Sequence, residues 1–367
     1  MLATMRGETV DRPAFNFYEI TGCEDTHSDD PFCIFSHPSW HPLVALARDH
    51  TDRLPRHKIP VHRETADDIE TKTSFDENGS RIIESTRRLG SRTFRQVTQQ
   101  DRDVDTVWTT EHWLKDEEDL RIWLDAPPHA AYGCVVDPEP FLRLECEIGD
   151  TGLAILDTAD PICYVATLFD MATYTVVAFT DPALFRRALD RVAENLFPAL
   201  EAISAALPGR LWRIVGPEFA VPPYLPPHLF SEYVTPYLRT MVDIIQRHGG
   251  WARVHSHGRL HAILDDICST GCAGLDPIEP PPQGDVELAY VREKYGRQMV
   301  LFGNLEASDI ETLPTPRFAE KVRRALDEGT RGEGRGFVLQ PSASPYGRIL
   351  SPLAMRNYEA MVEIAGG

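Results

Sequence analysis

From about residue 150 onward, the sequence alternates short apolar runs with longer segments of helical periodicity. The apolar runs read as buried strands at 152–157, 211–216, 251–257, 273–278, 299–302 and 336–339. Helices are expected at 182–207, 227–248, 259–268, 285–295, 315–328 and 353–364. Strands separated by helices pair in parallel through right-handed crossovers. This many units, with no glycine-rich dinucleotide fingerprint after a strand, favours an α/β fold with a single (β/α)₈ TIM-type barrel over an open sheet.

The N-terminal third has a different pattern. Residues 60–112 alternate polar and apolar residues in runs that start at Val61, Arg81, Arg92 and Val107, with a turn at 77–80. Such alternation is typical of half-solvated antiparallel strands. We therefore expect one barrel domain over 1–367 with an antiparallel β-hairpin insertion at 60–112. Around it we expect a strand at 14–19 and helices at 42–50 and 111–124.

A cluster of cysteines and histidines between residues 23 and 41 could be mistaken for a zinc site. It consists of Cys23, His27, Cys33, His37 and His41, at spacings of four, six, four and four residues. These spacings contain no tight ligand pair of a zinc ribbon or finger. The segment is therefore interpreted as a long functional loop.

Charge and cysteine content indicate which partners and which cellular location to expect. The formal net charge of −19 disfavours nucleic acid and anionic membrane surfaces as partners. Seven scattered cysteines without a CxxC pair indicate reduced thiols and a cytoplasmic location. The chain shows neither an apolar run of the roughly 20 residues that cross a bilayer nor the apolar core of a signal peptide.

Polar and ionisable residues follow almost every expected strand. They are Asp157, Glu218, His255, His257, Asp276, Glu279, Asn304, Gln340, Ser342 and Tyr346. In a barrel, the chemistry is located at the carboxyl ends of the strands, so this set is expected to line one pocket. The alternative for some of these positions, Asp157 among them, is that the side chain caps the following helix.

His255 and His257 are the two histidines of this set. Residues two apart in a strand point to the same side, so both imidazoles can face one cavity. Two nitrogen ligands at a strand end could begin a divalent-metal site, most naturally for zinc. The alternative is one catalytic or hydrogen-bonding histidine beside a structural neighbour.

Several motifs resemble the uroporphyrinogen decarboxylase superfamily over nearly the whole chain. They are Val-Asp-Arg-Pro at 10–13, His-x-His-Gly at 255–258, Asp-Pro-Ile-Glu-Pro-Pro at 276–281, Gly-Asn at 303–304 and Gly-Phe-Val-Leu-Gln-Pro at 336–341. The resemblance implies a distorted (β/α)₈ barrel. It also implies one of two activities: cofactor-free decarboxylation in haem biosynthesis, or zinc-dependent methyl transfer to or from corrinoid proteins or thiols.

The sequence departs from both activities at defined positions. Phe15–Gly22 lacks the arginines of the decarboxylase motif Met-Arg-Gln-Ala-Gly-Arg-Tyr and carries Glu19, which disfavours a polycarboxylate porphyrinogen. In the methyltransferase pattern, His257 and Ala343 stand where two cysteine ligands are expected. The remaining ligand set is His255, His257 and Glu218, a harder site that suits zinc and also iron or manganese.

The resemblance implies metal-assisted demethylation of a small methoxylated or methylamine-type substrate, with a corrinoid protein as methyl acceptor. Asp276 and Glu279 are expected to orient substrate or exchange protons, and Asn304 and Tyr346 to hydrogen-bond it. The expected substrate-binding residues are Phe17, Glu19, Asp157, Arg259, Gln340 and Ser342. Family members often dimerise, so a homodimer is also expected.

Two other interpretations remain open. One is a metal-independent decarboxylase or related lyase for a small aromatic or heterocyclic acid, in which Arg259 pairs with the carboxylate. The other is a barrel retained as a binding or regulatory subunit, since both thiolate ligands are lost.

Overall fold

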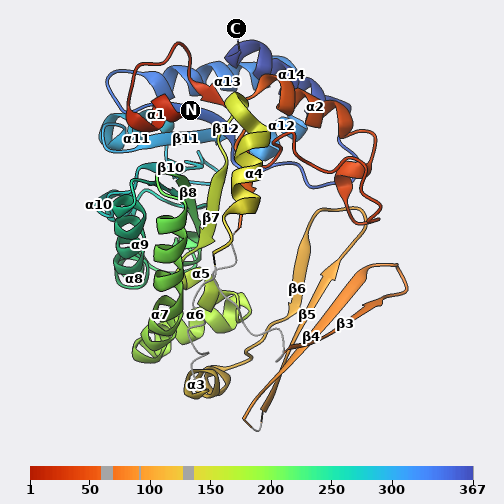
Figure 1. Ribbon diagram of the computed structural model, residues 1–367, viewed down its shortest axis with the longest axis vertical. Helices are drawn as coiled ribbons and strands as arrows, with labels where there is room; N and C mark the ends of the chain where they lie inside the picture. Colours follow the sequence, from red (N-terminus) through yellow and green to blue (C-terminus); the bar gives the residue numbers. More distant parts are fainter. Residues whose placement is uncertain (59–68, 91, 127–135, 367) are drawn as a thin grey trace.

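The computed structural model describes residues 1–58, 69–90, 92–126 and 136–366, and its centre is a curled sheet of eight parallel strands (Figure 1). Their spatial order is β1-β12-β11-β10-β9-β8-β7-β2. Their bounds are Ala14–Phe15 (β1), Arg56–His57 (β2), Ile155–Ala159 (β7), Leu211–Val215 (β8), Trp251–His255 (β9), Gly274–Asp276 (β10), Val300–Leu305 (β11) and Phe337–Pro341 (β12). From β2 to β12 each parallel strand pairs with the next one in the sequence, and β1 pairs with β12, so the predicted α/β, TIM-barrel-like fold is confirmed.

The two ends of this sheet, β1 and β2, are joined through a side chain. The backbone N–H of Asp52, just before β2, donates to the carbonyl of Phe15 at 2.8 Å. The Asp52 carboxylate accepts from the N–H of Phe15 at 3.0 Å and pairs with Arg12 at 2.7 Å. Asp52 therefore links the edge of β1 to the start of β2, where the sheet order leaves both strand edges without a ladder partner.

Helices cover the outer face of the curled sheet. Those of the β/α units and the C-terminus are α5 (Pro161–Ala166), α6 (Met171–Thr180), α7 (Pro182–Ala206), α8 (Pro227–Tyr233), α9 (Thr235–Arg247), α10 (Leu264–Ser269), α11 (Leu288–Tyr295), α12 (Ala307–Thr312), α13 (Thr315–Thr330) and α14 (Pro352–Ala365). The earlier ones are α1 (Leu2–Arg6), α2 (His41–His50), α3 (Glu117–Asp125) and α4 (Glu139–Ile148), with short 3-10 turns at 34–36, 149–151 and 217–220. No helix in these described segments is long and apolar enough to span a membrane.

Several helix boundaries differ from the sequence prediction. The helix expected at 227–248 is divided at Val234 into α8 and α9. The helix expected at 259–268 begins only at Leu264. The helix expected at 111–124 begins at Glu117, because β6 continues to Glu111 and the side chain of Asp116 caps the helix by accepting from the N–H of Asp119.

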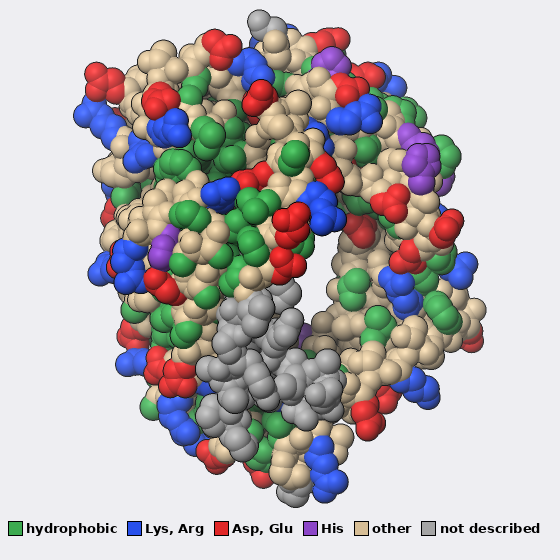
Figure 2. Space-filling view, viewed as in Figure 1, with side chains coloured by type: hydrophobic (Ala, Val, Ile, Leu, Met, Phe, Trp, Pro, Cys, Tyr) green, Lys and Arg blue, Asp and Glu red, His purple; other side chains and the backbone are tan. Residues whose placement is uncertain are grey.

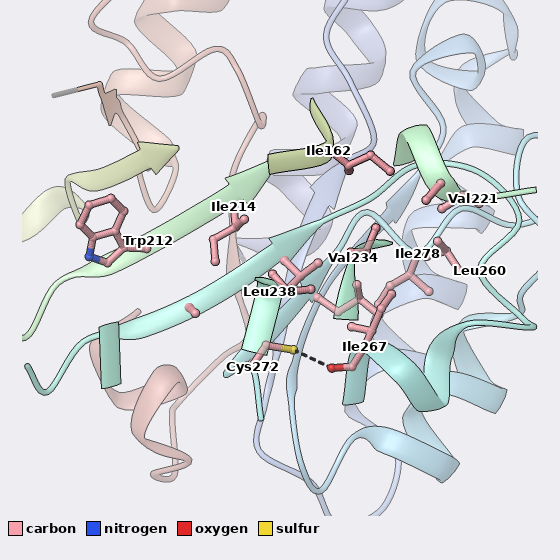
Figure 3. Close-up of a cluster of buried hydrophobic side chains, with 14 of the residues drawn as sticks. Ile162, Trp212, Ile214, Val221, Val234, Leu238, Leu260, Ile267, Cys272 and Ile278 are labelled. Atoms are coloured by element: carbon pink, nitrogen blue, oxygen red, sulfur yellow. Dashed lines mark hydrogen bonds between the residues drawn. The ribbon is translucent and has the colours of Figure 1, made fainter. Parts of the chain in front are cut away.

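Alternation along the strands divides the core into two parts. One set of strand residues faces the helices, and Figure 3 shows part of this cluster, in which Trp212 and Ile214 of β8 lie on the same side as residues of the surrounding helices. The other set fills the lower barrel interior with Met5, Ala14, Leu54, Ile155, Leu211, Ala273, Val300, Phe302 and Val338. The amino-terminal end of the barrel is therefore filled with apolar side chains, and the polar side chains of the interior lie at the carboxyl end.

The insertion forms a separate four-stranded antiparallel sheet. Its strands are β3 (Ile69–Phe75), β4 (Arg81–Leu89), β5 (Arg92–Gln100) and β6 (Val107–Glu111), in that spatial order. The predicted turn lies between β3 and β4, where the Asp76 carboxylate accepts from the N–H groups of Asn78 and Ser80 at 2.9 Å. The alternation of 69–75 was not recognised as a strand, and the strand expected at 61–64 lies outside the described residues.

Candidate functional site

Strand alternation determines which side chains enter the carboxyl end of the barrel. In β1, Phe15 packs in the helix-facing core while Ala14 faces the barrel interior. The same alternation carries Asn16 and Tyr18 toward the interior, and both are buried. Asn16 continues the strand by donating its N–H to the carbonyl of Leu339 at 3.0 Å, and its side-chain oxygen accepts from the N–H of Tyr18 at 2.7 Å. The positive φ of Tyr18, 62°, is a conformation that side chains rarely adopt.

Asp276 is the centre of one buried network. It is fully buried at the end of β10, and its Oδ2 lies 2.9 Å from Nδ1 of His255. Gln340 of β12 donates to the same oxygen at 3.3 Å and accepts from Asn16 at 3.4 Å. Because the ionised carboxylate only accepts, His255 carries its proton on Nδ1, and Nε2 is left as the acceptor.

His257 forms a second imidazole–carboxylate pair beside the first. Its Nδ1 lies 2.9 Å from Oε1 of Glu279, whose Oε2 accepts the N–H of Gly258 at 3.1 Å. β9 ends at His255, so His257 lies just outside the strand, and the two rings meet edge to face with centroids 4.7 Å apart. No partner for Nε2 of His257 is found among the described residues, and the side chain is 36% exposed. This imidazole is therefore held at one nitrogen and accessible at the other.

Buried arginines complete the interior of the site. Arg213 of β8 forms a two-point pair with Asp157 at 2.7 and 3.1 Å and donates to the hydroxyl of Tyr18 at 2.7 Å. Arg253 of β9 lies over the ring of Phe302 and contacts Asp276 at 3.1 Å. The Tyr18 hydroxyl is also 3.3 Å from the ring nitrogens of His255, which connects the arginines to the histidines.

The two histidines have opposite pKa shifts. Burial lowers the pKa of His255 despite the charge of Asp276, so this ring is neutral at pH 7. Burial acts to lower the pKa of His257 as well, but the hydrogen bond and the charge of Glu279 outweigh burial and raise this pKa. Burial, with the charges of Glu279 and Asp309, raises the pKa of Glu306 to about 7. The barrel mouth therefore holds one neutral and one protonatable imidazole next to a protonatable carboxyl group.

The structure brings together seven of the predicted site residues: Asp157, Glu218, His255, His257, Asp276, Glu279 and Gln340. Glu218 is the outer member of this set. Its carboxylate accepts from the N–H of Gly216 at 3.0 Å, and its charge raises the pKa of His257.

Six other predicted residues lie elsewhere. Phe17 is buried in the helix-facing core, 4.6 Å from the ring of Tyr358, because alternation turns it away from the barrel. Glu19 is exposed on the rim and pairs with Arg56 at 3.2 Å, and Arg259 is exposed. The Ser342 hydroxyl accepts from the N–H of Ala307 at 3.3 Å, at the start of α12.

Asn304 and Tyr346 complete that group of six. Asn304 lines a pocket of about 130 Å³ outside the barrel interior, together with Lys321 and Arg324 of α13. The glycine before it is required because a Cβ on Gly303 would lie 2.1 Å from the carbonyl oxygen of Pro277. Tyr346 is 58% exposed, and its carbonyl accepts from the N–H of Asp105 beside the antiparallel sheet.

The donor set does not assemble a complete metal site. Within the described ranges, no group of three His, Cys, Asp or Glu side chains is arranged to hold a metal ion. Both histidines have the carboxylate-held Nδ1 that is common behind metal ligands, but that arrangement equally suits proton transfer. The ligand set His255, His257 and Glu218 therefore stays a prediction.

Five buried site residues were not predicted from the sequence: Asn16, Tyr18, Arg213, Arg253 and Glu306. The two arginines had a usable signal, because each is a charged residue inside a short apolar strand whose neighbours are buried. Tyr18 had a weaker signal, since its assignment depends on knowing that the alternation starts at Ala14.

The barrel mouth faces the insertion. Figure 2 shows an opening through the surface between the barrel and the antiparallel sheet, with acidic and basic side chains at its border. The two parts are tied by backbone bonds, since Arg348 donates its N–H to the carbonyl of Asp103 at 2.7 Å and Val104 pairs with Gly347. The insertion is therefore fixed beside the loop that follows β12.

Comparisons with known proteins agree with this architecture. The model of the uroporphyrinogen decarboxylase (URO-D) family matches residues 160–366. A methyltransferase from Methanosarcina mazei is similar in structure, with a TM-score of 0.64 and 18% identity, covering 100% of this chain and 96% of that one. A D-psicose 3-epimerase from Clostridium cellulolyticum H10 is more distant, with a TM-score of 0.35 and 10% identity over 62% of this chain and 85% of that one. No curated protein sequence matches this chain.

Proposed function

Because the chain belongs to the uroporphyrinogen decarboxylase family, we propose that it is an enzyme of the family's methyltransferase branch that demethylates a small methoxylated or methylamine-type substrate. The observation that carries this proposal is the His257–Glu279 pair at the barrel mouth. Breaking a carbon–oxygen bond leaves negative charge on the oxygen, and an imidazolium beside it can supply the proton. The structural likeness to a methyltransferase supports the fold required for this chemistry.

Each residue of the site has a role that follows from its position. His257 delivers its proton to the leaving heteroatom from Nε2, while Glu279 fixes the ring through Nδ1 and stabilises the imidazolium. His255, neutral and held by Asp276, accepts a hydrogen bond at Nε2. Tyr18 and Gln340 close the inner side of the site and exclude water from it. A corrinoid carried by a partner protein would accept the methyl group.

A direct assay tests the proposal. Purified protein would be mixed with 4-methoxybenzoate or trimethylamine and with cob(I)alamin as acceptor, and methylcobalamin would be followed by its visible absorbance. Methylcobalamin formation that depends on protein and donor is the expected result. Release of carbon dioxide from an acid, with no methylcobalamin, would instead identify a decarboxylase, and binding without either product would identify a binding protein.

The decarboxylase is the second candidate because it needs the same proton donor. The residue expected to pair with its carboxylate, Arg259, is exposed rather than beside the histidines. Methyl transfer is therefore the better-supported function.

The raised pKa of His257 predicts a pH dependence. The acid form is the active one, so turnover is expected to be highest below the pKa of His257 and to fall as pH rises through it. In Glu279→Gln the charge that raises this pKa is absent, so the basic limb of the profile should move to lower pH. A pH–rate profile of both proteins, in which the limb failed to move, would contradict the role of Glu279.

Metal analysis tests the predicted ligand set separately. If Nε2 of His257 instead binds a metal ion rather than donating a proton, with His255 and Glu218 as the other ligands, purified protein should contain close to one equivalent of zinc, iron or manganese. His257→Ala and Glu218→Ala should then each lose it, whereas the surface variant His261→Ala should keep it. Equal metal content in all of these proteins would contradict this ligand set.

A further inference from the structure

A concentration of positive charge occupies the side of the mouth formed by β2, β8 and β9. It consists of Arg56, Lys58, Arg213 and Arg253, and the carboxylates in contact with them are Glu19, Asp157 and Asp276. Four cations contact three carboxylates, so the cations outnumber their direct partners by one. In a chain of net charge −19, this local excess is not a general property of the surface.

The cations converge on one aromatic ring. The guanidinium carbons of Arg56 and Arg213 lie 5.4 and 5.8 Å from the ring centre of Tyr18. Nζ of Lys58 lies 3.9 Å from Oδ2 of Asp157, and the Lys58 side chain is 78% exposed. This ion pair is therefore weak. Like charges gathered in this way repel one another, and a bound anion would offset the repulsion.

Arg253 supplies an independent observation. It is 2% exposed, and its Nε and Nη1 atoms have no hydrogen-bond partner among the described residues. The nearby Oδ1 of Asp276 is likewise buried without one, since the 3.1 Å contact between the two is not aligned as a hydrogen bond. A buried guanidinium with unmatched donors is costly to the fold, and such groups in native proteins usually serve a ligand.

We propose that this cluster of Arg56, Lys58, Arg213 and Arg253 binds a carboxylate group of the substrate. Arg56 and Lys58 on the rim contact the carboxylate, and the buried Arg213 and Arg253 provide the positive potential beneath it. Guanidinium groups favour planar carboxylates because two N–H donors match two oxygens. The substrate of the proposed methyl transfer is then a methylated monocarboxylic acid, an inference that rests on the proposed function.

The position of the cluster sets the direction in which the substrate lies. Two successive ring contacts lead from Tyr18 to His257, with centroid distances of 5.8 Å from Tyr18 to His255 and 4.7 Å from His255 to His257. An acid bound at the cluster therefore extends past His255 toward His257. The carboxylate therefore orients the methylated heteroatom toward the proton donor.

Calorimetric titration tests the site without any turnover. The probes are two matched pairs, 4-methoxybenzoate against 4-methoxybenzamide, and methoxyacetate against methoxyacetamide. In at least one pair the acid is expected to bind about 10- to 100-fold more tightly than its amide, the range of a charge-assisted hydrogen bond. Arg56→Gln and Lys58→Gln should each reduce this preference about tenfold, because they remove donors on the rim.

The matched control is Arg297→Gln, since Arg297 also pairs with one glutamate, at 3.1 Å, but is 74% exposed and far from these residues in the fold. It should leave the preference unchanged. Absence of acid preference in both pairs, or an Arg56→Gln protein with the wild-type preference, would overturn the carboxylate site. Failure of methyl transfer with the preference intact would remove the proposed function and leave the site, so the two failures are distinguishable.

Discussion

His257→Ala is expected to lower the rate of methyl transfer by about 10²- to 10⁴-fold, the usual contribution of one general acid. The reason is that Nε2 of His257 is the accessible nitrogen of a carboxylate-held imidazole at the barrel mouth, whereas His255 is 5% exposed and neutral. The rate would be measured in a single turnover with excess enzyme, so that substrate binding and chemistry are separated.

Two further variants make this result specific to proton donation. Glu279→Gln keeps the size of the side chain and should lose less activity than His257→Ala, with its pH profile displaced as described above. His261→Ala removes an exposed histidine that stacks on Tyr290 and should retain wild-type turnover. If His257→Ala kept within about twofold of the wild-type rate, another group would have to be the proton donor.

Asp276→Leu is expected to have the largest effect on stability, a loss of about 3–5 kcal/mol in the free energy of unfolding. The side chain is fully buried, and its removal leaves the guanidinium of Arg253 without its carboxylate contact and Nδ1 of His255 with only the 3.3 Å contact to the Tyr18 hydroxyl. Urea denaturation followed by far-UV circular dichroism would measure the change.

The double variant Arg253→Met/Asp276→Leu distinguishes charge from shape. When both charges are replaced by apolar side chains, about half or more of the lost stability should return, because no unpaired charge stays buried. Asp327→Ala, which removes an exposed aspartate of α13, should change the free energy of unfolding by less than about 0.5 kcal/mol. A double variant no more stable than Asp276→Leu would show that packing, not charge, dominates at this position.

The same network predicts how stability responds to acid. Burial acts to raise the pKa of Asp276, but the charge of Arg253 and the hydrogen bond from His255 outweigh it and hold the pKa well below its ordinary value. A carboxyl group with a depressed pKa contributes stability above its unfolded pKa of about 3.9 and loses that contribution as pH falls toward the folded value. Between neutral pH and about pH 3, wild-type protein should therefore lose more stability than the double variant, as denaturation at several pH values would measure.

Several contacts among the residues at the strand ends could be predicted from the sequence. His255, Asp276 and Gln340 were predicted to share one pocket, and the structure joins them by hydrogen bonds because parallel strands bring their carboxyl ends to one edge. Glu279 was predicted as a proton-exchanging residue, and it contacts His257 directly. These assignments needed only the strand positions.

The side of the strand to which Phe17 and Tyr18 point could not be predicted from the motif. Phe17 and Glu19 were chosen from the motif comparison, but alternation from Ala14 points Phe17 to the helices and carries Tyr18 into the barrel. Asn304 and Tyr346 were also placed at strand ends, yet one lines an outer pocket and the other is exposed in a loop. A motif gives the order of residues along a strand end but not the side to which each one turns.

The sequence by itself determined the α/β class, the parallel strands, the antiparallel insertion and the imidazole–carboxylate composition of the mouth. These features follow from local periodicity and from residue type, which a linear pattern contains. Tertiary structure alone decided which carboxylate holds which histidine, and it placed Arg213 against Tyr18 and Arg253 against Asp276 and Phe302. Those pairings depend on strand register and sheet curvature, through which residues more than 190 positions apart come into contact.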